Sequence, residues 1–264
     1  MKPLKLFMFD FDGTALGGHE PYDQFPRHFS KFLDKLDAMG IRWATNTTWG
    51  PQGQYTAALR GGVKSEPVLL TGQTGRMIAT VKNHKVIMER EHEQAVLRRE
   101  RRFHLKHWDE VRKAALELLR RDLVDRLSLD EWNQVSFHCD RRHSKEVWGI
   151  LRPFVESGAY YSWNAVCKGN GGMLVAYFHN KGAILKLVMK RLHIGPENVI
   201  IAGDGINDLH MFEPNLARWM VCPDNAEPLL KEKVRRYSGI VSKKKYSWGV
   251  VDGVKQVLRK LGYV

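Results

Sequence analysis

Hydrophobic and polar positions near the start of the chain predict a strand, a helix and a second strand. Residues 4–9 form an apolar run that ends abruptly at Asp10, as a buried parallel strand does. Apolar side chains then recur every three or four positions over residues 25–38, which predicts an amphipathic helix, and Gly40 supplies a stop. A second apolar strand is expected at residues 41–45. This order begins a βαβ series, so we expect a parallel sheet.

The same pattern returns near the end of the chain. Residues 181–192 carry apolar side chains at helical spacing, and residues 198–203 form another buried strand. A polar, glycine-bearing turn that begins at Asp204 follows this strand at once. A short strand at residues 219–222 and a helix over residues 249–261 complete this half. Both halves are therefore predicted to build one α/β domain.

The middle of the chain has a different character. Residues from about 82 to 170 carry long charged stretches, with an expected strand at 132–138 and an expected helix at 144–157. We interpret this part as a second, α+β domain that is inserted into a loop of the first. The expected division is 1–81 for the first part of the core, 82–177 for the insertion and 178–264 for the second part of the core.

Composition excludes several classes of protein. The chain has 264 residues, of which 43% are hydrophobic, and this is ample for a packed core. No apolar run approaches the roughly 18 residues that a membrane span needs. Its three cysteines lie far apart in the sequence and offer neither a disulfide framework nor a Cys-x-x-Cys metal site. An acid at position 10 interrupts the stretch that would form a signal peptide. We therefore expect a cytoplasmic protein.

The chain is strongly basic, with 42 Lys+Arg residues, 29 Asp+Glu residues and a formal net charge of +13. This charge is compatible with a nucleic acid, a membrane surface or an anionic small substrate as a partner, or with solvated faces. Within residues 231–260, ten basic residues stand against two acidic ones, so much of the surplus is local. The run from Arg98 to Arg102 is interpreted as a solvated helix face. We expect no membrane partner and no nucleic-acid partner, and the oligomeric state stays open.

Polar residues at the strand ends are the candidates for a site, because open parallel sheets bind ligands outside the carboxyl ends of their strands. The candidates come from distant parts of the chain and are Asp10, Asp12, Thr45, Lys181, Asp204 and Asp208. Crowded carboxylates repel one another, and such clusters persist when a cation neutralises them. Hard oxygen ligands without His or Cys favour Mg²⁺. With a lysine and a threonine hydroxyl nearby, the set suits a phosphoryl group.

The segment Asp10-Phe11-Asp12-Gly13-Thr14 resembles the first signature of the haloacid dehalogenase (HAD) superfamily of phosphohydrolases. The remaining signatures of that superfamily are present in the same order along the chain. They are Thr45 at the end of a strand, Lys181 at the start of a helix, and the segment 203–208.

The insertion and two further sequence segments resemble the type IIB branch of this superfamily, which includes Cof-like sugar phosphatases and sucrose-phosphate phosphatases. The segments are Asn180-Lys181-Gly182 and Asn225-Ala226-Glu227-Pro228. The resemblance covers about residues 4–80 and 178–264 and is weak across the insertion. It implies a Rossmann-like parallel-sheet core with an inserted α+β cap of the C2 type.

Carried over position by position, the resemblance implies roles for the catalytic residues. Asp10 would be the nucleophile and a metal ligand, and Asp12 would be the general acid/base that also lends its backbone carbonyl to Mg²⁺. Lys181 would stabilise the charge of Asp10 and of the transferred group. Thr45 would bind the phosphoryl oxygens, with Thr47 or Thr48 as rivals.

The resemblance implies further ligands. Asp204 would bind the metal, Asp208 would bind it directly or through water, and Asn207 would orient the phosphate. Asn46 replaces the glycine of many Cof-like members and is placed among the phosphate-binding residues. Lys168, in the glycine-rich loop 168–172, is a candidate for contact with the substrate from the cap.

The expected function is a Mg²⁺-dependent phosphatase that hydrolyses a small phosphate monoester, most plausibly a phosphorylated sugar, through an aspartyl-phosphate. Two alternatives stay open. One is a phosphoryl transferase like the phosphomannomutases, which share the first signature. The other is a basic nucleic-acid-binding protein with a residual phosphatase site, although no nucleic-acid-binding motif supports it.

Overall fold

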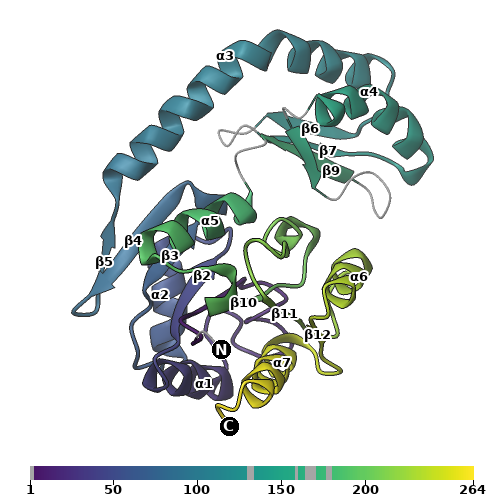
Figure 1. Cartoon of the computed structure of the whole chain (residues 1–264). Helices are drawn as coiled ribbons and strands as arrows, with labels where there is room; N and C mark the ends of the chain where they lie inside the picture. Colours follow the sequence, from purple (N-terminus) through teal and green to yellow (C-terminus); the bar gives the residue numbers. More distant parts are fainter. Residues whose placement is uncertain (1–2, 130–133, 158–159, 164–170, 177–179) are drawn as a thin grey trace. The chain divides into compact units, whose positions relative to one another are not determined.

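The computed structural model of the chain describes residues 3–129, 134–157, 160–163, 171–176 and 180–264 (Figure 1). The chain forms two compact units, one of Met1–Glu93 with Asn180–Val264 and the other of Gln94–His179. The sequence placed the first boundary at residue 82, but the hairpin of β4 (Met77–Lys82) and β5 (Lys85–Met88) lies in the first unit. The hairpin stays there because β4 pairs with β3 (Leu69–Gly72) of the central sheet.

The first unit is built on an eight-stranded sheet in the order β12-β11-β10-β1-β2-β3-β4-β5. Six of these strands, from β12 to β3, run parallel, and the β4–β5 hairpin adds two antiparallel strands at one edge. The strands not yet defined are β1 (Leu6–Phe9), β2 (Arg42–Asn46), β10 (Val199–Ala202), β11 (Trp219–Cys222) and β12 (Ile240–Val241). The mixed α/β fold with a mostly parallel sheet is therefore confirmed.

Helices cover both faces of this sheet, as Figure 1 shows. They are α1 (Arg27–Ala38), α2 (Pro51–Arg60), α5 (Lys181–Leu192), α6 (Pro228–Arg236) and α7 (Tyr246–Lys260). Side chains of α1, α2 and α7 pack into one apolar cluster with Phe7, Phe9 and Trp43. Side chains of α5 and α6 pack into a second cluster with Leu6, Met8 and Ala44. Neighbouring residues of β1 and β2 thus face opposite layers, which explains why β1 is apolar at every position.

The register of the sheet determines where the candidate residues come together. Strand β1 pairs in parallel with β10 and β2, with Phe9 opposite Ala202 on one side and Thr45 on the other. The residues that follow these three strands therefore leave the sheet at one edge. Asp10 begins the segment after β1, and the turn at Asp204 belongs to the segment after β10.

The second unit has its own sheet and core. Four antiparallel strands lie in the order β6-β7-β9-β8. The strands are β6 (Arg126–Leu129), β7 (Gln134–His138), β8 (Tyr160–Trp163) and β9 (Gly171–Ala176), and the helices of this part of the chain are α3 (Arg90–Arg120) and α4 (Ser144–Glu156). Apolar side chains from α3, α4 and β7, among them Leu118, Phe137 and Val147, form a separate cluster.

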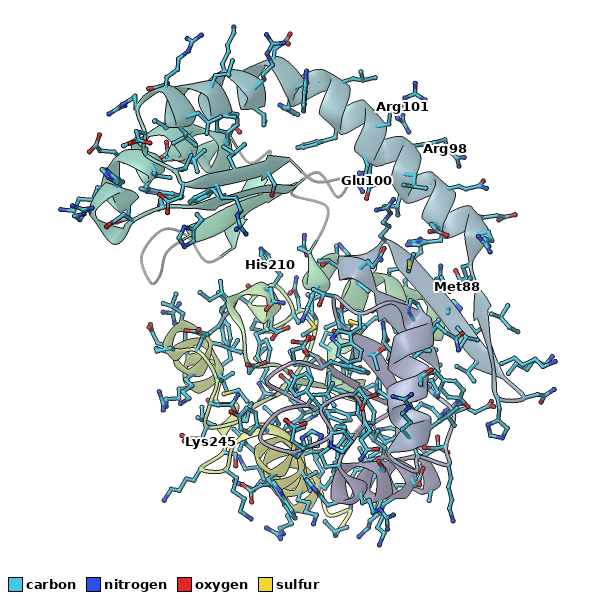
Figure 2. The ribbon with its side chains drawn as sticks, turned by 180° about the vertical axis from the view of Figure 1, so that it is seen from behind. Met88, Arg98, Glu100, Arg101, His210 and Lys245 are labelled. Atoms are coloured by element: carbon cyan, nitrogen blue, oxygen red, sulfur yellow. The ribbon has the colours of Figure 1, made fainter. Side chains whose placement is uncertain are left out.

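Helix α3 carries the basic run from Arg98 to Arg102. Arg98 and Arg101, labelled in Figure 2, are exposed, and so are Arg99 and Arg102, while Glu100 is buried. The expected solvated face therefore comprises the arginines of the run and not its glutamate. Among the described helices, none combines the length and apolar character that a bilayer crossing requires.

Candidate active site

Asp10 stands directly after β1, where the backbone leaves the sheet. Its N–H still donates to the carbonyl of Ala202 on β10, over 3.1 Å, so its position is tied to the sheet. The residue is 5% exposed, and one carboxylate oxygen lies 2.8 Å from Nζ of Lys181. The fully buried strand thus ends in a carboxylate that is fixed on the backbone side and paired on the side-chain side.

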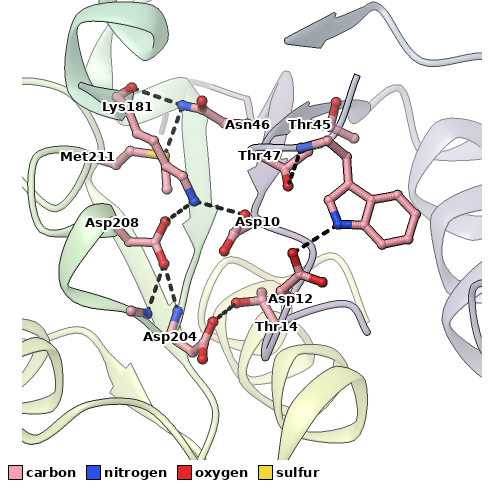
Figure 3. Close-up of polar contacts among 12 residues, drawn as sticks. Asp10, Asp12, Thr14, Thr45, Asn46, Thr47, Lys181, Asp204, Asp208 and Met211 are labelled. Atoms are coloured by element: carbon pink, nitrogen blue, oxygen red, sulfur yellow. Dashed lines mark hydrogen bonds and ion pairs between the residues drawn. The ribbon is translucent and has the colours of Figure 1, made fainter. Parts of the chain in front are cut away.

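Lys181 is the first residue of α5 and is fully buried. The helix begins there because Oδ1 of Asn180 accepts a hydrogen bond from the N–H of Ala183, over 2.8 Å, as an N-cap does. The ammonium of Lys181 also lies 2.6 Å from Oδ1 of Asp208, and so it bridges two carboxylates (Figure 3). A buried lysine is tolerated only with such partners.

The turn after β10 is organised by Asp208. Its Oδ2 accepts hydrogen bonds of 2.9 Å from the backbone N–H groups of Asp204 and Gly205, while its Oδ1 faces Lys181. This fully buried carboxylate therefore orders the turn that presents Asp204. The hydroxyl of Thr14 donates to Oδ1 of Asp204 over 2.7 Å and connects this turn with the segment after β1.

Gly13 is required where these two segments meet. Its φ is +77°, and a Cβ at this position would lie 2.0 Å from Oδ2 of Asp204. Any side chain would both strain the backbone and displace that carboxylate. The glycine of the first signature therefore allows Asp204 to approach the segment after Asp10.

Three carboxylates, of Asp10, Asp204 and Asp208, each offer an oxygen, and these oxygens lie within 4.8 Å of one another. Burial raises the pKa of Asp10 to about 7, with the ammonium of Lys181 opposing this effect and the charge of Asp208 adding to it. Burial also raises the pKa of Asp204 to about 8, and the charges of Asp208 and Asp10 contribute. When ionised, these three carboxylates carry more negative charge than the ammonium of Lys181 neutralises.

Lys181 itself stays charged. Burial alone would lower the pKa of its ammonium, but the charges of Asp10 and Asp208 and their hydrogen bonds raise it above the ordinary value of 10.5. A protonated lysine beside Asp10 is the arrangement that stabilises negative charge on a nearby anionic group.

The carboxylate of Asp12 stands apart from this cluster. Its Oδ1 accepts a hydrogen bond from the hydroxyl of Tyr22 and its Oδ2 accepts one from the indole N–H of Trp49, each over 2.9 Å. The two aspartates of the first signature therefore have different surroundings: Asp10 faces an ammonium, and Asp12 faces two neutral aromatic donors.

Thr45 and Asn46 are fully buried at the end of β2 and have partners within the protein. The hydroxyl of Thr45 donates to Oε1 of Gln54. The amide of Asn46 donates to the carbonyl of Lys181 over 2.9 Å and contacts the sulfur of Met211 at 3.3 Å. Asn46 therefore holds the start of α5, and the predicted contacts of Thr45 and Asn46 with phosphate remain predictions.

The remaining sequence candidates do not belong to the group of three carboxylates and Lys181. Asn207 is half-buried in the turn after β10, and a Cβ on Gly205 would lie 2.4 Å from its Oδ1. Lys168 lies outside the described residues. Thr47, one of the rivals of Thr45, is fully buried just after β2, and its Oγ1 accepts a hydrogen bond of 3.4 Å from the N–H of Trp49.

Residues 64–252, more than half of the chain, match the family of haloacid dehalogenase-like hydrolases. The chain belongs to this family. The match includes Lys181, Asp204 and Asp208 but begins after Asp10, which the geometry brings to the same site. The resemblance inferred from the sequence signatures is thereby confirmed.

Several solved structures share the fold of this chain at low sequence identity. The sucrose-phosphatase of Synechocystis sp. PCC6803, solved with sucrose and phosphate, is 18% identical, with a TM-score of 0.65 over 97% of this chain and 98% of that chain. A sugar phosphatase of HAD subclass IIB is 15% identical, with a TM-score of 0.60 over 98% and 100% of the two chains. A HAD-like hydrolase of Bacillus subtilis is 16% identical, with a TM-score of 0.60 over 99% and 93%.

A curated phosphatase relative is similar to part of the chain. It is a Metamycoplasma hominis protein named for a phosphatase of the upp 3′ region, and it is 32% identical over 87 residues. The matched stretch spans 31% of this chain and 29% of the relative's length.

The sequence patterns missed several residues of this HAD site. Thr14 stands in the first signature without an expected role, and its hydroxyl donates a hydrogen bond to Asp204. Tyr22, Trp49 and Gln54 carried no signal, because they lie outside the signatures and their contacts reach residues more distant in the sequence, such as Asp12 from Trp49.

Proposed function

We propose that this HAD hydrolase is a Mg²⁺-dependent phosphatase that acts on a phosphorylated sugar through an aspartyl-phosphate. The observation that carries the proposal is the buried contact of 2.8 Å between Asp10 and Lys181, at the carboxyl end of a parallel strand and within a group of three carboxylates. A carboxylate held beside an ammonium is suited to attack a phosphoryl group whose oxygens need positive charge.

The residues present fit a magnesium ion. Asp10, Asp204 and Asp208 provide hard oxygen atoms within 4.8 Å of one another, and no thiol or imidazole belongs to this group. Burial raises the pKa values of Asp10 and Asp204, and the charges of neighbouring carboxylates add to this, so a divalent cation would favour the ionised forms. Asp10 and Asp204 would hold the ion, and Asp208, whose oxygens already have partners, would act through its charge. When bound, the ion would neutralise phosphoryl oxygens as a Lewis acid.

The proposed reaction has two steps, the phosphorylation of Asp10 and the hydrolysis of the resulting aspartyl-phosphate. In the first, a carboxylate oxygen of Asp10 attacks phosphorus, the bond from phosphorus to the leaving oxygen breaks, and Asp12 gives its proton to that oxygen. In the second, Asp12 takes a proton from a water molecule that attacks the phosphoryl group. The bond between Asp10 and phosphorus then breaks, and inorganic phosphate leaves. Lys181 keeps its charge throughout and stabilises the transferred group.

The sugar part of the proposal is supported by similarity of fold. Two of the structures that resemble this chain over nearly their whole length are a sucrose-phosphatase solved with sucrose and phosphate and a subclass IIB sugar phosphatase. The second compact unit, with its α+β composition, corresponds to the proposed inserted cap. Its role would be to select the leaving group.

A panel of phosphate esters tests this proposal. The purified protein with Mg²⁺ is offered sugar phosphates, nucleotides, a phosphorylated amino acid and 4-nitrophenyl phosphate, and released inorganic phosphate is measured. We expect release from the aryl ester and the highest kcat/KM for one or more sugar phosphates. A preference for nucleotides would contradict the sugar assignment. Movement of phosphate between sugar hydroxyls, without release, would contradict hydrolysis.

Thermal unfolding at two pH values tests the metal site. The folded-state pKa values of Asp10 and Asp204 are raised above the unfolded-state values, so the native protein keeps protons that the unfolded chain releases. The stability of the metal-free protein should therefore fall as the pH rises from 6.5 to 8. Because Mg²⁺ replaces these protons, it should raise the Tm by roughly 5 °C at pH 8 and by clearly less at pH 6.5.

Histidines whose pKa is lowered by burial, His28 and His210, act in the opposite direction, because they make the stability rise with pH. Burial lowers the pKa of His28 to about 4, and its unfolded value is 6.5, so His28 changes the stability mainly below pH 6.5. The Asp204→Asn variant should lose most of the gain in Tm. An equal gain at both pH values, or full activity in excess EDTA, would contradict the magnesium site.

A further inference from the structure

The carboxylate of Asp12 is held by two aromatic side chains, one on each oxygen. The hydroxyl of Tyr22 donates to Oδ1 and the indole N–H of Trp49 donates to Oδ2, both over 2.9 Å. Tyr22 belongs to the segment between β1 and α1, and Trp49 follows β2. Asp12 is labelled in Figure 3. Two elements of the core thus converge on one carboxylate and fix its plane.

Trp49 is held firmly at this place. Its indole lies 5.7 Å from the ring of Phe11, measured between ring centroids, and packs against the apolar cluster on this face of the sheet. Its backbone is bound on both sides, because its carbonyl accepts a hydrogen bond of 2.6 Å from Gln54 and its N–H donates to Oγ1 of Thr47.

Gln54 connects this loop to the sheet. The residue is fully buried on α2, and its side chain binds three segments at once. Its amide nitrogen donates hydrogen bonds to the carbonyls of Trp49 and of Thr71 on β3. Its amide oxygen accepts a hydrogen bond from the hydroxyl of Thr45 on β2. The indole N–H of Trp49 therefore reaches Asp12 from a position that the sheet determines. In this arrangement the hydroxyl of Thr45 supports Asp12 through Gln54 and Trp49.

Tyr22 is positioned by its own segment. The ring of His19 stacks on it with centroids 6.4 Å apart, and the two nitrogens of that ring lie 3.0 and 2.9 Å from the carbonyl oxygens of Gly17 and Gln24. Burial raises the pKa of the Tyr22 hydroxyl, and the hydrogen bond to Asp12 and the charge of Asp12 add to this, so the hydroxyl keeps its proton. The residue is still 40% exposed, so the side chain reaches Asp12 from the solvent side.

We infer that Tyr22 and Trp49 are positioning residues that hold the carboxyl group of Asp12 in the orientation for proton transfer to and from the reacting oxygens. The inference rests on the proposed function, in which Asp12 is the general acid/base. The indole is a donor only, whereas the phenol can donate or accept, so the pair is compatible with Asp12 in both of its protonation states. A small misplacement of a catalytic group has a large effect on rate.

Esters with different leaving groups test this inference. Protonation of the leaving oxygen matters greatly for phenyl phosphate and little for 2,4-dinitrophenyl phosphate, whose phenolate leaves without a proton. Phenolate release is measured in single turnovers with Mg²⁺ for wild type, Tyr22→Phe and Trp49→Phe. We expect each variant to react about 10-fold to 100-fold more slowly with phenyl phosphate and less than about threefold more slowly with the dinitrophenyl ester.

The matched control is Tyr55→Phe, which also removes one phenolic hydroxyl from the first unit. That hydroxyl contacts Nδ1 of His84 at 3.0 Å, a contact that does not involve Asp12. The control should show wild-type rates with both esters. Tyr22→Phe removes a single oxygen from a partly exposed side chain, so the test does not depend on how well Trp49→Phe folds.

Each outcome decides between supporting and overturning the inference. An equal loss with both esters would indicate a purely structural role and would overturn it, and so would wild-type rates in both variants. Failure of the proposed function looks different, because wild-type protein would then release no phenolate from either ester.

Discussion

Asp10→Asn is expected to lower the hydrolysis of 4-nitrophenyl phosphate by at least about a thousandfold, because an amide oxygen does not form the aspartyl-phosphate. The fold should persist. The amide keeps an oxygen for the ammonium of Lys181, which lies 2.8 Å from the native carboxylate. Because burial raises the pKa of Asp10, loss of its charge should leave the metal-free protein at least as stable as wild type. Activity and thermal unfolding in EDTA measure the two expectations.

Asp37→Asn is the matched control for this change. Asp37 lies on α1 and forms a surface ion pair of 3.2 Å with Arg42, and such pairs contribute little to stability. Its replacement should leave activity unchanged. Retention of a tenth of the wild-type rate by Asp10→Asn would exclude Asp10 as the nucleophile. A beryllofluoride adduct on Asp12 would exchange the proposed roles of the two aspartates.

Much of the core could be predicted because its physics is local in sequence. The apolar runs before Asp10 and Asp204 predicted buried parallel strands, and the parallel pairing of β1 with β10 brings the following residues to one edge of the sheet. The expected helix over 25–38 begins two residues later, at Arg27, because Pro26 has an extended backbone with ψ of 138°. Family membership followed from the same segments, since the signatures are the ends of these strands.

The contacts of Thr45 and Asn46 could not be predicted from the pattern. Both stand at a strand end, where alternate side chains face opposite layers, and the pattern does not say what each layer offers. Thr45 meets Gln54 on α2, whereas Asn46 meets the carbonyl of Lys181, which is 135 positions away in the sequence. Only the packed helices on the two faces determine these partners.

The boundary between the two units also could not be predicted from the sequence pattern. Strand β4 belongs to the first unit because it pairs with β3, and β5 belongs to it because it pairs with β4. These partners are determined by the folded sheet and not by the local sequence. The expected boundary at residue 82 therefore fell inside the hairpin, before the turn to β5, whereas the first unit continues to Glu93.

Lys181→Met is expected to lower the free energy of unfolding by about 3 to 5 kcal/mol, because it leaves two buried carboxylates without their common cation. In the native protein the ammonium lies 2.8 Å from Asp10 and 2.6 Å from Asp208 and is fully buried. Activity with aryl phosphates should fall by roughly a thousandfold, since the charge beside the transferred group is lost. Urea unfolding and kcat measure the two effects.

Lys186→Met is the matched control on the same helix, because Lys186 is exposed and the variant should stay within about 0.5 kcal/mol of wild type. Adding Asp208→Asn to Lys181→Met tests the cause of the expected loss of stability. The second change removes one of the stranded charges, so the double variant should be more stable than Lys181→Met alone, although the hydrogen bonds of Asp208 to the turn at Asp204 limit the recovery. If the two losses simply add, the buried ion pairs are not what stabilises this site, and the electrostatic account of the cluster fails.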